Sequence, residues 1–134
     1  MHYLVGLDIG DKRIGIALSD SLGLAPRAHA TVEVGKFFDY FQDLIKEHNC
    51  KQVIIGLPKH RDGSDSEQTQ KVRNFVEQIS TKFADLEFHF EDEVLTSSEA
   101  QSRLKSRGIK IQENNKGLID SEAAAIILEQ YFAN

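Results

Sequence analysis

The sequence predicts an α/β fold with a five-stranded mixed sheet, in which three antiparallel strands are followed by parallel additions and helices cover both faces. Two apolar, β-favouring runs, 4–9 and 14–18, are separated by the polar turn Asp11-Lys12-Arg13, which is typical of a hairpin. From residue 36 onward, helical and strand-like patterns alternate, as they do in sheets with crossover helices. Because no linker or internal repeat divides the chain, residues 1–134 are expected to form a single domain.

The first strand has apolar residues on both faces, which predicts a central place in the sheet. Its second face also carries Asp8, two residues before the glycine that ends the run. A carboxylate in such a place is costly unless something positive meets it, and chain exits from strands often hold site residues. We therefore interpret Asp8 as a candidate site residue rather than a turn cap.

The middle of the chain continues with a turn at 22–26 and a weaker third strand at 28–34. A helix is expected over 36–49, because its apolar residues follow helical spacing: Phe37, Phe38, Phe41, Leu44 and Ile45. Residues 53–55 form a short buried strand that Gly56-Leu57-Pro58 is expected to stop.

The second half starts with a polar, locally basic loop at 59–64, after which Ser64 and Glu67 fit a capping box for the next helix. A strand with alternating apolar residues follows over 86–91 and leads to Asp92 and Glu93. Thr96 with Glu99 resembles another capping box, opening a helix that ends near residue 108. A polar loop at 109–117 precedes the last helix.

That last helix is expected to begin near Ile119. Counted from Asp120, the positions that share its helical face are apolar: Ala123, Ala124, Ile127, Leu128 and Tyr131. Asp120 therefore lies in the first turn on the side that packs against the sheet.

Composition limits the classes of function. The 134 residues are 40% hydrophobic and 28% charged, which is ordinary for a globular protein, and we expect neither a membrane span nor a leader segment. The lone Cys50 cannot form an internal disulfide, which favours a reducing, cytoplasmic setting. The net charge of −5 argues against a generally basic surface, so a nucleic-acid ligand would need a local basic patch or a bound metal.

Acidic residues fall at three element ends: Asp8, the pair Asp92-Glu93, and Asp120. If right-handed crossovers make the three strands that precede or carry them neighbours, these carboxylates converge on one edge of the sheet. They would repel one another unless a hard divalent cation neutralised them, and oxygen-only ligands suit Mg²⁺ or Mn²⁺. Two such ions can activate a water and stabilise the leaving oxygen in phosphodiester cleavage.

Four motifs, in order along nearly the whole chain, carry a family resemblance. They are GLDIGDKRIGIALSD at 6–20, IIGLP at 54–58 with DGS at 62–64, DEVLTSSEA at 92–100, and NKGLIDSEAAAIILEQYF at 115–132. On these motifs the chain resembles the YqgF family, described as Holliday-junction-resolvase-like, in the RNase H-like superfamily.

The resemblance implies an RNase H-like fold and a metal-dependent nuclease that acts on structured nucleic acid, in a context of ribosome assembly and processing of the 5′ end of pre-16S rRNA. Asp8, Glu93 and Asp120 match the catalytic carboxylates, and Asp92 shares the second acidic position as a further candidate for metal binding. We prefer Glu93 there. The family usually has an arginine directly after this pair, where this chain has Val94.

Candidate phosphate contacts are the basic residues near these positions: Lys12, Arg13, Lys59, His60, Arg61 and Lys116. The loop at 59–61 also precedes a helix N-terminus, which can itself bind phosphate. The nucleic acid would be structured RNA or branched DNA, with no membrane partner, and the protein would be a monomer or a homodimer.

Three alternatives compete with an RNA nuclease. An ATPase of the actin, Hsp70 and sugar-kinase type also opens with Asp-x-Gly on a hairpin, but it needs two such domains. A junction resolvase must cut two strands symmetrically and favours a two-fold dimer. The third alternative is an RNase H-like module that binds RNA or a ribosome-assembly partner without cutting, which Val94 keeps open.

Overall fold

A five-stranded sheet forms the centre of the protein, with the strand order β3-β2-β1-β4-β5. The structure, a computed structural model, describes residues 2–93 and 96–134. The strands are β1 (Tyr3–Ile9), β2 (Arg13–Asp20), β3 (Arg27–Glu33), β4 (Cys50–Pro58) and β5 (Glu87–Glu93). The helices are α1 (Phe37–His48), α2 (Glu67–Lys82), α3 (Thr96–Ser106) and α4 (Gly117–Ala133), with short 3-10 turns η1 (Val34–Lys36) and η2 (Glu113–Asn115).

The pairing of the strands confirms the predicted fold class. β1, β2 and β3 form an antiparallel meander, and β4 and β5 add to β1 in parallel. β1 is the central strand, as its two apolar faces predict. The C-terminal ends of β1, β4 and β5 therefore lie at one edge of the sheet, where parallel strands of this kind build their sites.

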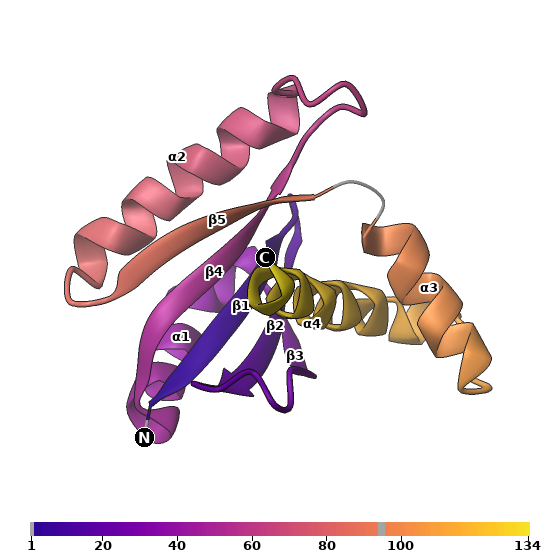
Figure 1. Ribbon diagram of the computed structural model, residues 1–134, viewed down its shortest axis with the longest axis horizontal. Helices are drawn as coiled ribbons and strands as arrows, with labels where there is room; N and C mark the ends of the chain where they lie inside the picture. The colour runs from indigo at the N-terminus through magenta and orange to yellow at the C-terminus, as the bar shows by residue number, and fades with distance from the viewer. Residues whose placement is uncertain (1, 94–95) are drawn as a thin grey trace.

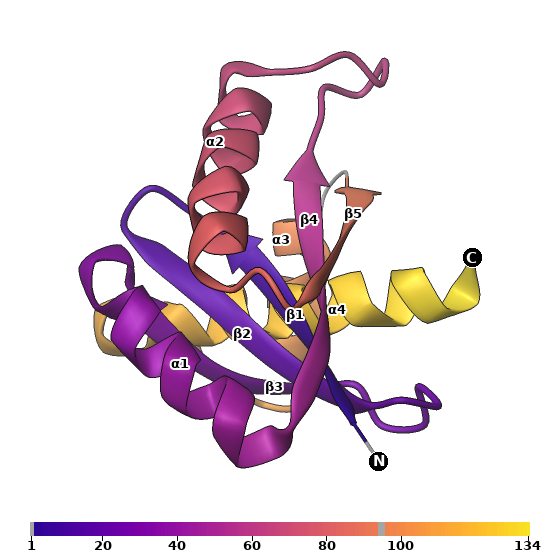
Figure 2. The same ribbon diagram turned by 90° about the vertical axis from the view of Figure 1, so that its left-hand side faces the viewer.

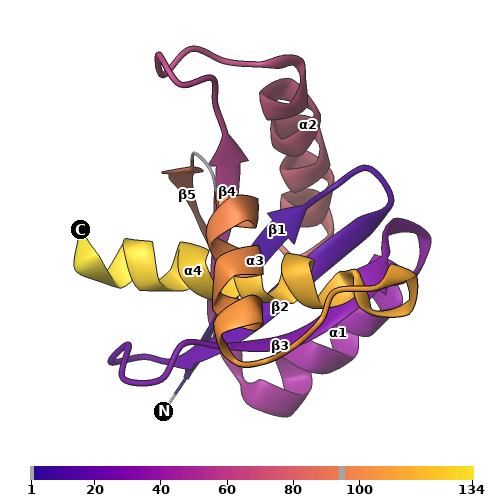
Figure 3. The same ribbon diagram turned by 90° about the vertical axis from the view of Figure 1, so that its right-hand side faces the viewer.

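Helices cover both faces of the sheet. Figure 2 shows α1 and α2 in front of the sheet, and Figure 3 shows α3 and α4 on the opposite side. The core under α1 and α2 is rich in aliphatic and aromatic side chains, with Phe37 and Phe41 fully buried and stacked on one another. Cys50 lies in this core, and burial raises the pKa of its thiol to about 12, so the thiol is a packing group.

The core under α4 uses smaller residues, which brings the helix close to the sheet. Ala124, Ala125 and Leu128 of α4 pack on Leu4 and Ile54 of the strands. At Gly15 of β2, an added Cβ would lie 2.0 Å from the backbone oxygen of Asp120. Only glycine fits there, and the first turn of α4 therefore lies directly on the hairpin.

Helix α3 packs mainly on α4 and stands away from α1 and α2 (Figure 1). Two arginines, Arg103 in α3 and Arg107 directly after it, hold it there. Arg103 makes a bidentate contact to Glu129, at 2.6 and 2.7 Å, and Arg107 contacts the buried Glu122 at 2.8 and 3.2 Å. A small apolar cluster of Ala100, Ala123 and Ile126 completes the contact between the two helices.

Some element bounds differ from those expected. β4 extends from Cys50 to Pro58 and includes Gly56 and Leu57, which were expected to stop it, because the strand pairs with β1 on one side and β5 on the other. The last helix begins at Gly117, and a 3-10 turn interrupts the segment expected to be a loop at 109–117.

The N-terminal cap of α2 is the clearest correction. The capping box is formed by Ser66 and Thr69 rather than by Ser64 and Glu67, because the Thr69 hydroxyl closes the reciprocal pair of hydrogen bonds. Among the helices of the described residues, none is both long and apolar enough to cross a bilayer.

Candidate active site

Asp8 lies near the C-terminal end of β1, on the face that α4 covers. Burial raises the pKa of its carboxyl to about 8, and the neighbouring charges of Glu93 and Asp120 add to this increase. Within residues 2–93 and 96–134, no hydrogen bond or ion pair reaches this carboxylate. The structure thus brings Asp8, Glu93 and Asp120 within electrostatic reach and leaves the central carboxylate uncompensated.

Glu93 is the last residue of β5, and its side chain is only 8% exposed. Burial raises the pKa of the carboxyl, and the Thr96 hydroxyl, which donates to Oε2, opposes that increase. The neighbouring strand makes room for it, because a Cβ at Gly56 would lie 2.9 Å from the Glu93 carboxyl carbon. Thr96 is the first residue of α3, and its hydroxyl, which was expected to cap that helix, donates to Glu93 instead.

Asp92, the other acidic residue at the end of β5, is exposed. Successive strand residues point to opposite faces, so the register that buries Glu93 beside Asp8 turns Asp92 away from it. Of the pair, Glu93 is therefore the neighbour of Asp8, and its role as a metal ligand stays a prediction.

Asp120 lies in the first turn of α4, with its side chain 22% exposed. Its Oδ2 accepts a hydrogen bond from Nε of Arg13, at 2.8 Å. Sequence reasoning placed both residues at the site but missed this contact, which joins positions 107 residues apart. No local pattern signals such a pair.

The donor chemistry of this cluster fits a hard divalent cation. Three carboxylates supply only oxygen, which Mg²⁺ and Mn²⁺ prefer. The pKa of Asp8 is raised chiefly by burial and further by the charges of Glu93 and Asp120, so a cation at this position would stabilise the ionised carboxylate. Among the described residues, no three acidic, histidine or cysteine side chains already stand in metal-binding geometry, and Asp120 is paired with Arg13. Ligation by these carboxylates therefore requires side-chain rearrangement.

Two of the expected phosphate contacts lie directly beside this cluster. Lys12 and Arg13 belong to the β1–β2 turn, and they line a cavity of about 260 Å³ together with Gly10, Asp11 and Asp120. Lys116 lies just before α4, where its ammonium group pairs with Glu113 at 2.8 Å.

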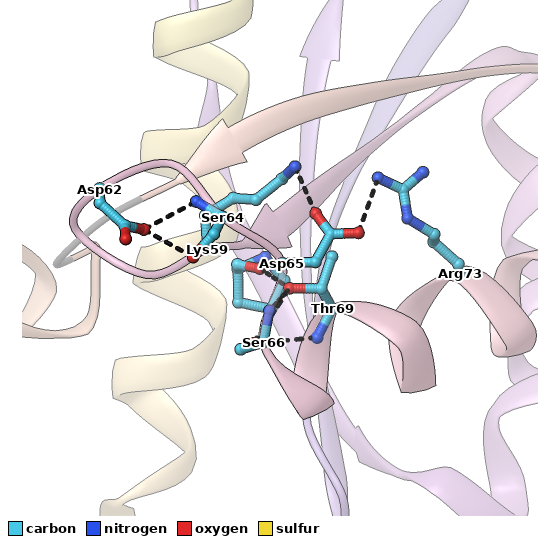
Figure 4. Close-up of polar contacts among 8 residues, drawn as sticks. Lys59, Asp62, Ser64, Asp65, Ser66, Thr69 and Arg73 are labelled. Carbon is cyan, nitrogen blue, oxygen red and sulfur yellow. Dashed lines mark hydrogen bonds and ion pairs between the residues drawn. The ribbon is translucent and has the colours of Figure 1, made fainter.

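The other expected contacts belong to the loop after β4. Pro58, the last residue of that strand, pairs with Glu93, so the loop leaves the sheet at the edge that holds the carboxylates. Lys59 is committed within the loop: its Nζ pairs with Asp65 at 2.6 Å, and Arg73 of α2 approaches the other oxygen of Asp65 at 3.8 Å (Figure 4).

His60 and Arg61 lie at the exposed turn of the same loop. The turn is ordered by its own contacts, since the Asp62 carboxylate accepts hydrogen bonds from the backbone and the hydroxyl of Ser64 (Figure 4). His60 and Arg61 are thus presented to solvent by a structured loop. Val94 lies outside the described residues.

Known proteins that are similar in sequence to this chain are named as nucleases or resolvases. A family model described as "RuvX: Holliday junction resolvase" matches residues 2–134. Curated proteins named "Putative pre-16S rRNA nuclease" are similar over nearly the whole chain: that of Crocosphaera subtropica is 41% identical, covering 95% of this chain and 90% of its own length. The corresponding figures are 38%, 95% and 85% for Gloeothece citriformis, and 35%, 96% and 92% for Lactococcus lactis subsp. cremoris.

Among solved structures, RuvC from Thermus thermophilus shares the fold. The TM-score is 0.57 at 12% identity, covering 96% of this chain and 94% of that one. The structure of T. thermophilus RuvC in complex with a Holliday junction substrate gives a TM-score of 0.55 at 12% identity, covering 98% and 94%. The expected RNase H-like fold is confirmed.

Proposed function

The chain belongs to the RuvX family, the group that its motifs identify as YqgF-like, and we propose that it is a metal-dependent nuclease that processes the 5′ end of pre-16S rRNA. It is a hydrolase of phosphodiester bonds. The observation that carries the proposal is Asp8, a half-buried carboxylate with no donor among the described residues and two acidic neighbours. Carboxyl groups whose pKa is strongly raised by burial and by neighbouring charges are concentrated at functional sites.

In this proposal, Asp8, Glu93 and Asp120 hold Mg²⁺ or Mn²⁺. The bound ion supplies an activated water and stabilisation of the leaving oxygen. Thr96 keeps the Glu93 carboxylate oriented through its hydroxyl, as groups behind metal ligands generally do. The positive charge of the ion also answers the net charge of −5, which would otherwise repel a polyanion.

The nucleic acid lies across the edge formed by the β1–β2 turn and the loop after β4. Lys12 and Arg13 bind phosphate next to the carboxylates, and Arg61 with His60 binds a phosphate farther along the strand. Lys59 orders the loop through its ion pair with Asp65, and Lys116 adds a positive charge for phosphate binding at the start of α4. The buried thiol of Cys50 suits the reducing cytoplasm, where ribosomes are assembled.

Cleavage of a second substrate, the four-way DNA junction, is the competing activity, since the matching family model carries the description of a junction resolvase. A resolvase cuts two strands symmetrically and so needs a two-fold dimer, whereas trimming of one RNA strand needs a single site. The oligomeric state at assay concentration separates the two activities.

The test is cleavage in Mn²⁺ of two probes: an RNA spanning the 5′ boundary of 16S rRNA and a four-way DNA junction. We expect the wild type to cut the RNA, and Asp8→Asn and Asp120→Asn to lose activity by about two orders of magnitude or more, the size typical of a lost electrostatic contact in the transition state. Asp92→Asn, which changes the exposed neighbour of Glu93, is the matched control and retains activity. Equal background activity in all four proteins refutes catalysis and favours a module that only binds.

A further inference from the structure

We propose that Arg13 is the counter-ion of Asp120 in the metal-free protein, and that a divalent cation displaces it and releases the guanidinium to hold a nucleic-acid phosphate in the adjoining cavity. This inference rests on the proposed function, because it concerns the same carboxylate cluster. Arg13 thus binds the Asp120 carboxylate in one state and a nucleic-acid phosphate in the other. As a result, metal binding and nucleic-acid binding favour each other.

Arg13 is held through only one of its nitrogens. Its Nε donates to Oδ2 of Asp120 at 2.8 Å, while the side chain remains 46% exposed. Within the described part of the chain, the two terminal nitrogens make no hydrogen bond. A guanidinium presents five N–H donors in a rigid fork, so most of its capacity to bind phosphate is unused in this arrangement.

The backbone on both sides of the contact is fixed, so exchange involves side chains only. Gly15 lets the first turn of α4 lie directly on β2. The hydroxyl of Thr31 in β3 donates to the backbone oxygen of Gly117 at 2.5 Å, which ties the start of the helix to the sheet. The Asp120 carboxylate therefore stays beside Asp8, whichever cation it faces.

A suitable space for a phosphate adjoins the pair. The cavity of about 260 Å³ is lined by Lys12 and Arg13, with Gly10 and Asp11 from the same turn and with Asp120, whose charge the bound cation would neutralise. The turn is closed by a backbone hydrogen bond from Gly10 to Arg13 at 2.9 Å. The Asp11 carboxylate faces Lys71 of α2 at 3.7 Å, which offsets its repulsion of an anion.

The order of events follows from charge. A divalent cation between Asp8, Glu93 and Asp120 gains far more from the carboxylates than one guanidinium at a partly exposed position. An exposed ion pair changes an equilibrium constant by about two- to fivefold, so pairing with Arg13 lowers the affinity of the carboxylates for the metal without preventing its binding. Once released, Arg13 still has Glu113 in its surroundings and the phosphate cavity beside it. By linkage, a phosphate that binds Arg13 and removes it from Asp120 raises the affinity for the metal by the same factor by which the metal raises the affinity for the phosphate.

The test measures Mn²⁺ affinity by electron paramagnetic resonance in the absence of nucleic acid, for wild type, Arg13→Gln and Arg27→Gln. Arg27 lies in β3, paired with Leu18, five residues along β2 from Arg13. Its replacement therefore makes the same change of net charge without touching the cluster. We expect Arg13→Gln to bind Mn²⁺ about three- to fivefold more tightly than wild type, and Arg27→Gln to differ by less than about twofold. Thermal melts of the three proteins without metal control for folding.

The same variants are then compared in steady-state cleavage at saturating Mn²⁺. Arg13→Gln should raise KM for the RNA several-fold, because a phosphate contact is lost, while Arg27→Gln leaves it unchanged. Tighter metal binding combined with weaker substrate binding is the signature of the proposal. Equal or weaker Mn²⁺ binding by Arg13→Gln overturns it, and so does an unchanged KM. If wild type binds no Mn²⁺ at all, the metal-dependent nuclease itself is refuted, and this inference with it.

Discussion

Replacing Asp8 with asparagine should stabilise the metal-free protein at neutral pH while abolishing its activity. The carboxyl has a pKa of about 8 in the fold, against an ordinary pKa of 3.8 in the unfolded chain. An acid whose pKa is raised by folding binds more protons in the native state, so between these two values the free energy of unfolding falls as the pH increases. Asparagine has nearly the same shape and no charge, and removes this dependence.

The magnitude follows from the pKa difference. One pKa unit corresponds to about 1.4 kcal/mol, and pH 7 lies about three units above the unfolded value, which gives an upper figure of roughly 4 kcal/mol. Asp8 retains some contact with solvent, which reduces the effect, so we expect Asp8→Asn to be more stable than wild type by roughly 2–4 kcal/mol at pH 7. Near pH 4 the two proteins should be almost equal.

The measurement is urea unfolding with a chelator, followed by circular dichroism at pH 4.5, 6 and 7.5 for wild type, Asp8→Asn and the control Asp92→Asn. A second series with Mg²⁺ should reverse the order, because a ligand that binds only the native state stabilises it and the variant has lost a ligand. A stability difference that stays constant with pH, or a variant less stable than wild type at pH 7.5 without metal, refutes the reasoning.

Three further predictions concern the contacts around the cluster. Thr96→Val should lower Mn²⁺ affinity or the cleavage rate by about 10–100-fold, because the hydroxyl that orients Glu93 is lost. It should also move the acid limb of the pH–rate profile to higher pH, since that hydroxyl lowers the pKa of Glu93. A profile identical to that of the wild type contradicts this. Gly15→Ala should lower the free energy of unfolding in urea by about 1–3 kcal/mol or more, because the new methyl group meets the backbone of α4. Gly35→Ala, with open space around it, is the control. Equal stability of the two variants counts against the close approach of α4 to Gly15. Glu122→Gln should destabilise the fold by about 1–3 kcal/mol, measured in the same way, because Arg103 of α3 and the adjoining Arg107 lose their buried partner. No change in the urea midpoint would show that these ion pairs do not hold α3.

Much of the fold could be predicted because strand patterns carry their own register. The period-two alternation in β1 puts Asp8 on the face of Leu4 and Gly6, and the same rule distinguishes Glu93 from Asp92 once one of them is known to be buried. The helical spacing after Asp120 placed that residue on the sheet side of α4. These periodicities are local, so a single sequence is enough to read them.

What could not be predicted depends on tertiary contacts. The segment Ser64-Asp65-Ser66 offers two serines as helix caps, and Ser66 is used because the Thr69 hydroxyl also bonds the backbone oxygen of Pro58. The Thr96 hydroxyl resembled a cap by spacing but bonds Glu93. Both choices were made by partners outside the helix, which a motif does not contain.

The attachment of α3 has a mechanical consequence for the two acidic residues it adjoins. It packs mainly on α4, whose first turn carries Asp120, and it begins at Thr96, whose hydroxyl holds Glu93. The Arg103–Glu129 and Arg107–Glu122 ion pairs link α3 and the residue after it to α4. A substitution that loosens the contact between α3 and α4 is therefore expected to disturb the placement of Glu93 and Asp120 together.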